Sequence, residues 1–264
     1  MKYENLIQRS DREFKRLTGV TPVLFHEMLQ VTTEAESRKV KSGRPHTLGL
    51  ADQLLLTLSY LRHYHTQLEL AAIYGLSESN VCRTIRKTED ALIRCKRFSL
   101  PKHKNPGDQT VIIDVTEIPI ECPKKQRQYY SGKKKRHTVK IQVIYGRETE
   151  KIISIRTGMG AQHDMRLAKK HLAELYPYKI VIADRGYQGL AKTGLQTPKK
   201  KSKYHPLDKQ DKEANRRLGK LRTVIGHINR KLKIFKILSL PYRNRRKRFG
   251  LRVNLIAGLV NAMG

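Results

Sequence analysis

Two short apolar segments, each carrying an aspartate, decide the fold of this chain: Val111-Ile112-Ile113-Asp114-Val115-Thr116 and Ile180-Val181-Ile182-Ala183-Asp184. Runs of β-branched residues of this length are typical of strands that are buried on both faces. A carboxylate within or at the end of such a strand is costly to bury unless a cation or a hydrogen-bond donor compensates it. Asp114 and Asp184 are therefore the first candidates for a functional site.

Further strands and helices are expected on either side of these two segments. The expected strands are 110–120, 137–145, 151–157, 178–183 and 194–197, with residues 147–150 as the turn of a hairpin. The expected helices are 164–175, 208–238 and 245–262. Strands with helices interleaved predict an α/β layered domain.

The N-terminal part of the chain shows the three-to-four-residue spacing of helices instead. Thr21 followed by Pro22 is typical of a helix start, and short helices are expected within residues 1–46. Leucines at helical spacing predict an amphipathic helix over residues 50–64. We therefore expect two domains, a helical one over residues 1–105 and an α/β one over residues 106–264.

Residues 66–85 show the pattern of two helices joined by a tight turn. Gly75 occupies the position where a helix end favours a left-handed residue, and Ser77 is a natural N-cap for the second helix. The residues expected to face inward are Leu70, Ala71, Ile73, Val81 and Ile85. Those expected to face outward are Glu78, Ser79, Asn80, Arg83 and Thr84. The pattern fits a helix-turn-helix whose second helix enters a DNA major groove, and it also fits an ordinary helical hairpin.

Charge is the strongest compositional feature of the chain. There are 55 Lys and Arg residues against 23 Asp and Glu, a formal net charge of +32. The surplus is uneven, with 18 basic and 11 acidic residues in 1–105 but 37 and 12 in 106–264. Such a surplus attracts polyanions over long range, and nucleic acid is the obvious one, with ribosomal RNA and membrane surfaces as open alternatives.

Composition also disfavours several classes of protein. No apolar run is long enough to cross a membrane, and the first residues do not have the pattern of a signal peptide. The three cysteines are scattered and odd in number, which disfavours a disulfide framework or a zinc site. We therefore expect a cytoplasmic protein that uses no membrane partner.

Asp114 and Asp184 are expected at or near the ends of neighbouring strands, where open α/β sheets place their sites. Two carboxylates there can hold Mg²⁺ ions, which activate a water or hydroxyl and stabilise the leaving oxygen at phosphorus. The alternative is structural, with Asp184 capping the following helix and Asp114 in a salt bridge with an arginine. The residues themselves leave both interpretations open.

Four ordered segments carry a family signature: Asp114-Val115-Thr116-Glu117-Ile118-Pro119-Ile120, Tyr129-Tyr130-Ser131-Gly132-Lys133-Lys134-Lys135-Arg136-His137-Thr138, His163-Asp164, and Ala183-Asp184-Arg185-Gly186-Tyr187-Gln188-Gly189. They resemble bacterial insertion-sequence transposases of the DDE superfamily, and the resemblance extends from about residue 15 to residue 264. It implies an RNase H-like mixed sheet flanked by helices, preceded by an all-α helix-turn-helix domain. It also implies DNA strand cleavage and joining at transposon ends that depends on Mg²⁺ or Mn²⁺.

The resemblance assigns Asp114 and Asp184 as the first two catalytic acids and metal ligands. The third acid should be a Glu in the helical pattern R-x₃-E-x₆-K, but this chain has Gly226 at that position, between Arg222 and Lys233. Glycine supplies no ligand, and no Asp or Glu lies C-terminal of residue 213. Helical spacing places residues 222, 226, 229 and 233 on one stripe, beside a buried apolar stripe.

Several other residues are expected to contact DNA or to assist the site. Arg222 and Lys233 are expected to hold phosphate oxygens. The remaining DNA-binding candidates are Ser79, Asn80, Arg83, Thr84, Lys133 and Lys134. Glu117 is either a salt-bridge partner or an aid to a metal, and Asp164 is either a helix cap or a site residue.

The leading hypothesis is a transposase that binds the terminal inverted repeats of its element, with strand cleavage and transfer impaired by Gly226. Its partners would be double-stranded DNA, as transposon ends and as target, and further copies of itself on that DNA in the nucleoid. The alternative favoured by Gly226 is a non-catalytic DNA-binding remnant or a repressor of related elements. A structure-specific nuclease on the same fold is a third hypothesis.

Overall fold

The computed structural model describes residues 2–40, 46–101, 107–191, 194–201, 206–243 and 246–264. Its contacts divide the chain into two compact units. The helical unit comprises Met1–Ser99, Leu232–Leu240 and Lys247–Gly264, and the sheet unit comprises Leu100–Lys231 and Pro241–Arg246. The predicted boundary between residues 105 and 106 lies outside the described residues. The C-terminal segments were assigned to the α/β domain from the sequence, whereas their contacts group them with the helical unit.

The helical unit is built from short, well-capped helices. They are α1 (Tyr3–Leu6), α2 (Asp11–Thr18), α3 (Pro22–Ser37), α4 (Leu50–His63), α5 (Gln67–Tyr74), α6 (Glu78–Arg94), the 3₁₀-helix η3 (Lys236–Leu238) and α10 (Phe249–Ala262). Thr21 caps α3 by accepting from the Leu24 N–H, with Pro22 in the first turn. These positions agree with the helices expected within residues 1–46 and over 50–64.

The predicted helix-turn-helix is present as α5, a tight turn and α6. Gly75 adopts the left-handed conformation at φ 64°, and the Ser77 hydroxyl accepts from the Asn80 N–H at 3.3 Å. Val81 and Ile85 are buried, as expected. Ile73 was expected to face inward but is 47% exposed. The buried residues of α5 are 70, 71 and 74, and position 73 falls about 100° away from the centre of that arc.

A buried carboxylate attaches the C-terminal helix within the helical unit. Glu89 on α6 is fully buried and accepts from Arg252 at 2.6 Å and from Arg248 at 2.8 Å. Arg248 also pairs with Asp90 at 2.7 Å, and the Arg252 guanidinium lies 5.1 Å from the centre of the Tyr60 ring. Residues far apart in the sequence thus form one ion cluster, which explains why α10 groups with the N-terminal helices.

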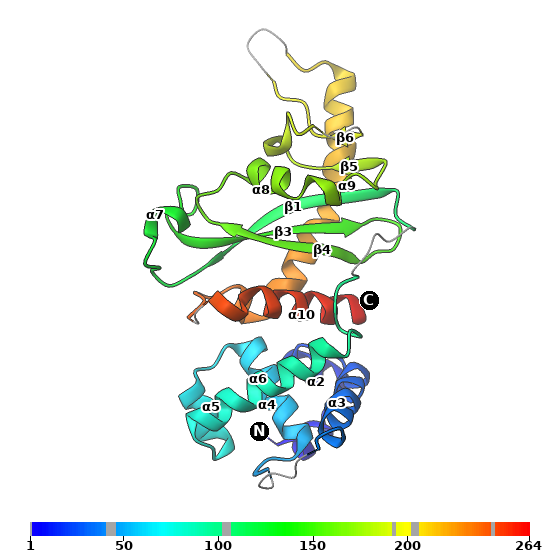
Figure 1. Cartoon of the computed structure of the whole chain (residues 1–264). Helices are drawn as coiled ribbons and strands as arrows, with labels where there is room; N and C mark the ends of the chain where they lie inside the picture. The colour runs from blue at the N-terminus through cyan, green and yellow to red at the C-terminus, as the bar shows by residue number, and fades with distance from the viewer. Residues whose placement is uncertain (1, 41–45, 102–106, 192–193, 202–205, 244–245) are drawn as a thin grey trace. The chain divides into compact units, whose positions relative to one another are not determined.

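The sheet unit is a mixed sheet with helices on both faces (Figure 1). Its strands are β1 (Thr110–Pro119), β2 (Tyr130–Ser131), β3 (Arg136–Gly146), β4 (Ile152–Met159), β5 (Ile180–Ile182) and β6 (Leu195–Gln196). Its helices are α7 (Gln126–Tyr129), α8 (Asp164–Lys170), η1 (Leu172–Glu174), η2 (Arg185–Tyr187) and α9 (Lys209–Lys233). The 3₁₀-helix η4 (Arg246–Arg248) begins at the last residue of the sheet unit, and its other residues belong to the helical unit.

The strand order is β2-β3-β1-β5-β6, with β4 on β3. The β1–β3 and β3–β4 pairs are antiparallel, whereas β5 is parallel to both β1 and β6. The expected strands are all present, but two expected helices are interrupted. The helix expected over 164–175 ends at residue 170 and continues as η1, and the helix expected over 208–238 ends at residue 233 because Phe235 is extended.

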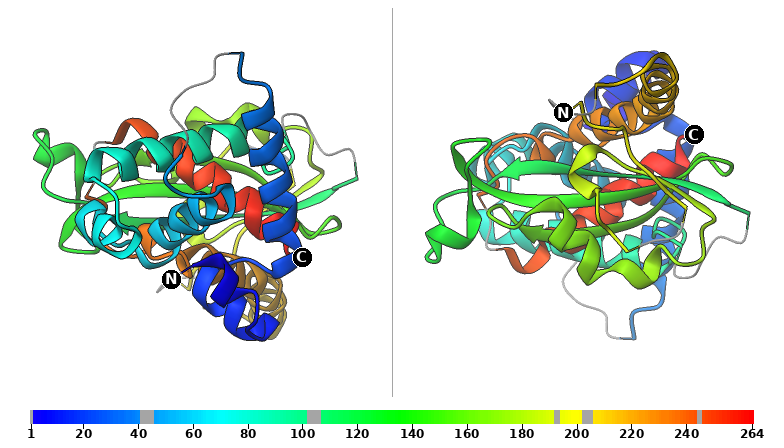
Figure 2. Two further views of the ribbon diagram at one scale, coloured as in Figure 1. Left: turned by 90° about the horizontal axis from the view of Figure 1, so that it is seen from below. Right: turned by 90° about the horizontal axis from the view of Figure 1, so that it is seen from above.

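Alternation along β1 separates the two faces of the sheet. Val111 and Ile113 face a core completed by Ala168 of α8, Val181 and Tyr187. Asp114 therefore points to the opposite face, where α9 lies (Figure 2). Across the described residues, no helix is long and apolar enough to span a membrane.

Removing the charge of Glu89 should destabilise the helical unit strongly. Glu89→Gln would leave Arg252, whose side chain is 6% exposed, without its carboxylate. Breaking one side of a buried ion pair costs about 3–5 kcal/mol. The measurement is urea-induced unfolding followed by circular dichroism. Glu34→Gln is the control, because Glu34 is 66% exposed and its pair with Arg38 is worth about 1 kcal/mol or less. Equal losses for both variants would contradict the role of Glu89.

Candidate active site and DNA interface

Parallel pairing brings the middle of β1, with Asp114, to the place where β5 ends and Asp184 follows. Ile112 pairs with Ile182 across β1 and β5, so Asp114 and Asp184 each lie two residues beyond a paired position. Asp184 follows β5 directly and caps η2, with Oδ1 accepting from the Gly186 N–H at 2.9 Å. The two carboxylates are close enough for the charge of Asp184 to affect the pKa of Asp114. Both predicted acids therefore belong to one site.

Asp114 is held by two side chains from α9. The Asn229 amide donates from Nδ2 to Oδ2 at 2.9 Å, and the Arg222 guanidinium lies 3.9 Å from Oδ1. Burial raises the pKa of Asp114 above its ordinary value and Asp184 adds to this, whereas Arg222 and Asn229 act in the opposite direction. The carboxylate keeps 24% of its side-chain surface exposed, so it remains open to a ligand.

The alternative interpretation of the two acids, in which they serve only the structure, agrees with part of what is observed. Asp184 is an N-cap and Asp114 contacts an arginine, as that alternative requires. These contacts do not separate the acids, because the register of β1 and β5 places each of them two residues beyond the paired positions Ile112 and Ile182. Structural and catalytic roles are compatible here.

Gly226 lies on the stripe of α9 that faces Asp114. The stripe is anchored by Ile225 and Ile228, which are buried on the neighbouring stripe. Arg222, one turn before Gly226, and Asn229, one turn after it, both contact Asp114. A Cβ added at Gly226 would meet nothing within 4 Å. A longer side chain at this position therefore has room to extend toward the two aspartates.

Three buried polar atoms around the site lack a hydrogen-bond partner among the described residues. They are Arg222 Nε, Asn229 Oδ1 and the Tyr187 hydroxyl. Burial raises the pKa of Tyr187, and the neighbouring carboxylates add to the effect, so this hydroxyl is a neutral group. Asn229 was placed on the correct stripe by helical spacing but was not predicted as a site residue. The signal in the sequence was that Asn229 lies three residues after position 226, where the third acid is expected, and so shares its face of the helix.

The donor set suits a divalent cation, since hard cations prefer carboxylate and amide oxygens. Asp114 and Asp184 supply the carboxylates. Within the described part of the chain, no group of three or more His, Cys, Asp or Glu side chains is placed to hold a metal ion. The site therefore contains two acids and lacks a third.

The other residues considered from the sequence lie apart from this pair. Glu117 points to the other face of the sheet and accepts from the Thr138 hydroxyl at 2.8 Å. Asp164 pairs with Lys140 at 2.7 Å, and His163 rather than Asp164 is the N-cap of α8. Lys233 ends α9 and belongs to the helical unit, and the exposed residues 133 and 134 lie in the turn before β3.

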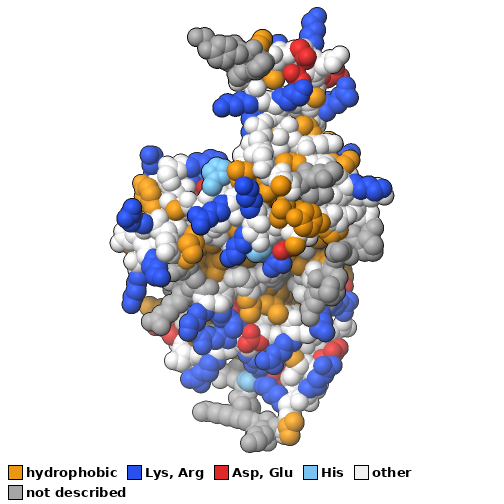
Figure 3. All heavy atoms as spheres, turned by 45° about the horizontal axis from the view of Figure 1, so that its top comes forward, with side chains coloured by type: hydrophobic (Ala, Val, Ile, Leu, Met, Phe, Trp, Pro, Cys, Tyr) orange, Lys and Arg blue, Asp and Glu red, His pale blue; other side chains and the backbone are white. Residues whose placement is uncertain are grey.

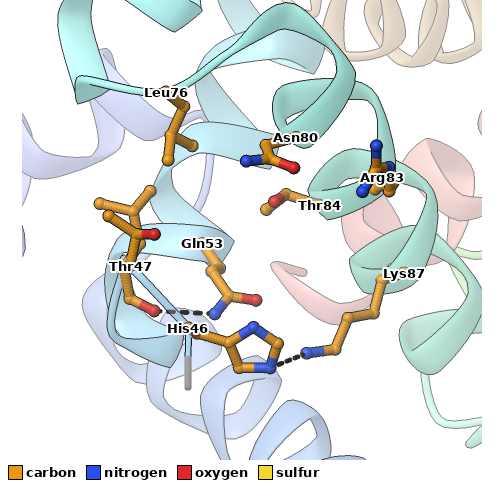
Figure 4. A pocket seen from close by; sticks show the side chains of 9 residues that line it. His46, Thr47, Gln53, Leu76, Asn80, Arg83, Thr84 and Lys87 are labelled. Carbon is orange, nitrogen blue, oxygen red and sulfur yellow. Dashed lines mark hydrogen bonds between the residues drawn. The ribbon is translucent and has the colours of Figure 1, made fainter. Parts of the chain in front are cut away.

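The outward face of α6 lines a pocket of about 560 Å³, to which both polar and apolar side chains contribute (Figure 4). Asn80, Arg83 and Thr84, all predicted DNA contacts, lie along it, and Ser79 is exposed but is not part of the lining. The sequence did not single out the other polar lining residues, which are His46, Thr47, Gln53 and Lys87. Lys87 follows Arg83 by one helical turn, and this spacing could have placed it on the same face of α6 as Arg83.

Charges around this pocket are organised by Glu36. Its carboxylate accepts from Lys39, Lys87 and His46 at 2.5, 2.6 and 3.0 Å. Burial acts to raise the pKa of Glu36, but these donors outweigh it and lower the pKa to about 2. Lys and Arg side chains are also spread over the face shown in Figure 3, with few Asp and Glu between them. A polyanion is therefore the expected partner of these surfaces.

The sequence of the chain matches two families of known proteins and is similar to two individual transposases. The family described as "DDE superfamily endonuclease" matches residues 113–261, and "Helix-turn-helix of DDE superfamily endonuclease" matches residues 46–97. The chain is 46% identical over 269 residues to the "Probable transposase for insertion sequence element IS702" of Microchaete diplosiphon, covering 99% of this chain and 98% of that protein. It is 26% identical over 227 residues to the "Putative transposase for insertion sequence element IS112" of Streptomyces albus G, covering 84% and 83%.

The chain belongs to the DDE superfamily of insertion-sequence transposases and carries the N-terminal helix-turn-helix of that family. The predicted RNase H-like mixed sheet and the predicted helix-turn-helix are confirmed. Family membership makes DNA the partner and implies dependence on a divalent metal ion. The roles of individual site residues stay predictions.

Substitutions next to Asp114 should move its pKa in opposite directions. Arg222→Gln removes a positive charge and should raise the pKa of Asp114 further, whereas Asp184→Asn removes a negative charge and should lower it. The measurement is a titration of the carboxyl ¹³C resonance of Asp114 in metal-free protein. Arg230→Gln, on the same helix, is the control and should leave the pKa unchanged. If the pKa of Asp114 moved in the same direction in both variants, Arg222 and Asp184 would not both be its charged neighbours.

Proposed function

We propose that this transposase binds the terminal inverted repeats of its element through α6 and directs strand cleavage at Asp114 and Asp184, using Mg²⁺ or Mn²⁺, with catalysis impaired by Gly226. The observation that carries the proposal is that Asp114 and Asp184 each lie two residues beyond a paired position of β1 and β5, with Asp114 in contact with the stripe of α9 on which Gly226 lies. Assembly of several copies on transposon ends and target DNA is part of the same proposal.

Each residue of the site has a separate task in this proposal. Asp114 and Asp184 hold the divalent cation, which when bound supplies activation of the attacking oxygen and stabilisation of the leaving oxygen at phosphorus. Arg222 binds a phosphate oxygen of the scissile strand, because its buried Nε lacks an acceptor among the described residues. The helix-turn-helix supplies sequence recognition, and the exposed lysines before β3, Lys133 and Lys134, contact the DNA backbone.

The absent acid at position 226 limits this chemistry. Two carboxylates contribute less negative charge than three, so a cation is held less firmly and less accurately between the reacting oxygens. Glycine also costs about 1 kcal/mol relative to alanine in the interior of a helix. Nothing packs against Gly226 that would require glycine there. We therefore propose slow cleavage together with normal DNA binding.

The same observation favours a second candidate function. A chain that recognises the repeats of related elements but does not cut them would compete with active copies for those repeats. The helix-turn-helix face is intact in this chain, with Asn80, Arg83 and Thr84 lining an open pocket. A DNA-binding repressor is therefore the alternative to a slow transposase.

Replacing Gly226 with glutamate should restore cleavage. Gly226→Glu places a carboxylate between Arg222 and Asn229, and an increase of about 100-fold or more in cleavage rate is expected, equivalent to several kcal/mol of transition-state stabilisation. The measurement is cleavage of end DNA in Mg²⁺, with DNA affinity measured alongside. Gly219→Glu is a matched control, because Gly219 is also an exposed glycine of α9 with open space around its Cβ. A parent chain that already cleaves as fast as Gly226→Glu would refute the proposed impairment.

Substitutions on α6 should separate specific from general DNA binding. Asn80→Ala and Arg83→Ala are each expected to weaken binding to the inverted repeat by about 1–3 kcal/mol, with a smaller loss on random DNA. The measurement is competition binding at one fixed salt concentration. Arg86→Ala removes the same charge from a part of α6 outside the pocket and should affect both DNAs equally. Equal losses on both DNAs for Asn80→Ala and Arg83→Ala would assign these residues to phosphate contacts instead.

A further inference from the structure

We propose that Asn229 supplies the third oxygen ligand of the metal site, from the turn of α9 that follows the position of the absent acid. The inference rests on the proposed function, because it assumes that Asp114 and Asp184 hold the cation. It adds a residue that the family pattern does not include, and it predicts that this chain still binds a metal ion despite Gly226.

The hydrogen bond to Asp114 fixes the orientation of the Asn229 amide. Nδ2 donates to Asp114 Oδ2 at 2.9 Å, so the nitrogen end of the amide is directed at the carboxylate. Oδ1, on the same amide group, is buried and has no hydrogen-bond partner among the described residues. A buried acceptor left without a donor costs about 1–3 kcal/mol, so such an oxygen is stabilised by a hydrogen-bond donor or by a cation.

A cation shared with the two aspartates meets that requirement. Amide oxygens are ordinary ligands of hard divalent cations, alongside carboxylates. Protein kinases hold Mg²⁺ with one aspartate and one asparagine, so a neutral amide is sufficient as a ligand beside a carboxylate. The amide of Asn229 can serve two functions at once. Its nitrogen orients Asp114 by a hydrogen bond, and its oxygen is left to bind the cation.

Helix geometry explains why position 229 can act for position 226. Residues three apart on a helix lie on the same face, about 4.5 Å apart along the axis. A glutamate at 226 would have to extend along the surface to reach the aspartates. The shorter Asn229 is already in contact with Asp114. The chain thus has an oxygen donor on the required face, but the donor is neutral rather than charged.

The test is Mn²⁺ binding to the full chain without DNA, measured by calorimetry and by electron paramagnetic resonance. Asn229→Ala should weaken Mn²⁺ binding about tenfold or more, and Asn229→Asp should strengthen it by adding a carboxylate. His227→Ala is the matched control and should change nothing, because His227 is an exposed side chain of the same helix whose imidazole is a general metal ligand but lies off the stripe that faces Asp114. Asp114→Ala and Asp184→Ala should each abolish binding.

The outcomes separate this inference from the proposed function. Unchanged binding in Asn229→Ala, with binding lost in Asp114→Ala and Asp184→Ala, would overturn the role of Asn229 and leave the metal site in place. Unchanged binding in all three variants would overturn both.

Thermal melting distinguishes a ligand from a hydrogen bond that only orients Asp114. Asn229→Asp places two carboxylates together, so it should melt below the parent in EDTA and above the parent in excess Mn²⁺, since a tighter-binding ion stabilises the folded state more. Melting below the parent under both conditions would show that Asn229 only orients Asp114 and would overturn the inference. Melting of Asn229→Ala in EDTA checks that the variant is folded.

Discussion

The parallel pairing of β1 with β5 is the constraint on which the site depends. Asp114 and Asp184 are seventy positions apart in the sequence, and this pairing places the middle of β1, with Asp114, beside the end of β5, where Asp184 follows. The pairing is stable because the apolar residues around each aspartate are buried, Val111 and Ile113 on one strand and Val181 on the other. A slip of one residue would turn either carboxylate into the apolar core, which its desolvation cost forbids. The hydrophobic pattern thus fixes the position of the acids.

The second constraint is the partial burial of Asp114. Burial raises its pKa, and the chain compensates with Arg222 and Asn229 from α9. These contacts hold the helix against the sheet edge and at the same time place Gly226 between them. The substitution to glycine is therefore tolerated by the fold, because neighbouring residues rather than position 226 attach the helix. The attachment of α9 to the sheet therefore does not depend on which side chain occupies position 226.

The helical unit depends on a different long-range interaction. Glu89 lies within the N-terminal helices, and its partners Arg248 and Arg252 lie near the C-terminus. The cost of burying this carboxylate is offset only when both guanidinium groups are in place. The second helix of the helix-turn-helix, α6, carries Glu89 on its buried face and the residues Asn80 and Arg83 on its exposed face. The C-terminal helix is therefore part of the structure that holds the helix-turn-helix in place.

The sequence by itself predicted most of the helices and strands and singled out the two aspartates. Apolar runs, caps such as Ser77 and the left-handed Gly75 are local signals, and local signals specify helices, strands and turns. The sequence also located Gly226 by its spacing from Arg222, although individual site roles stay predictions. Tertiary structure alone decided that Asn229 contacts Asp114, that Ile73 is exposed, and that Arg248 and Arg252 pair with Glu89. Each of these depends on which distant segment packs against a given face, and residue spacing along one helix or strand carries no information about that neighbour.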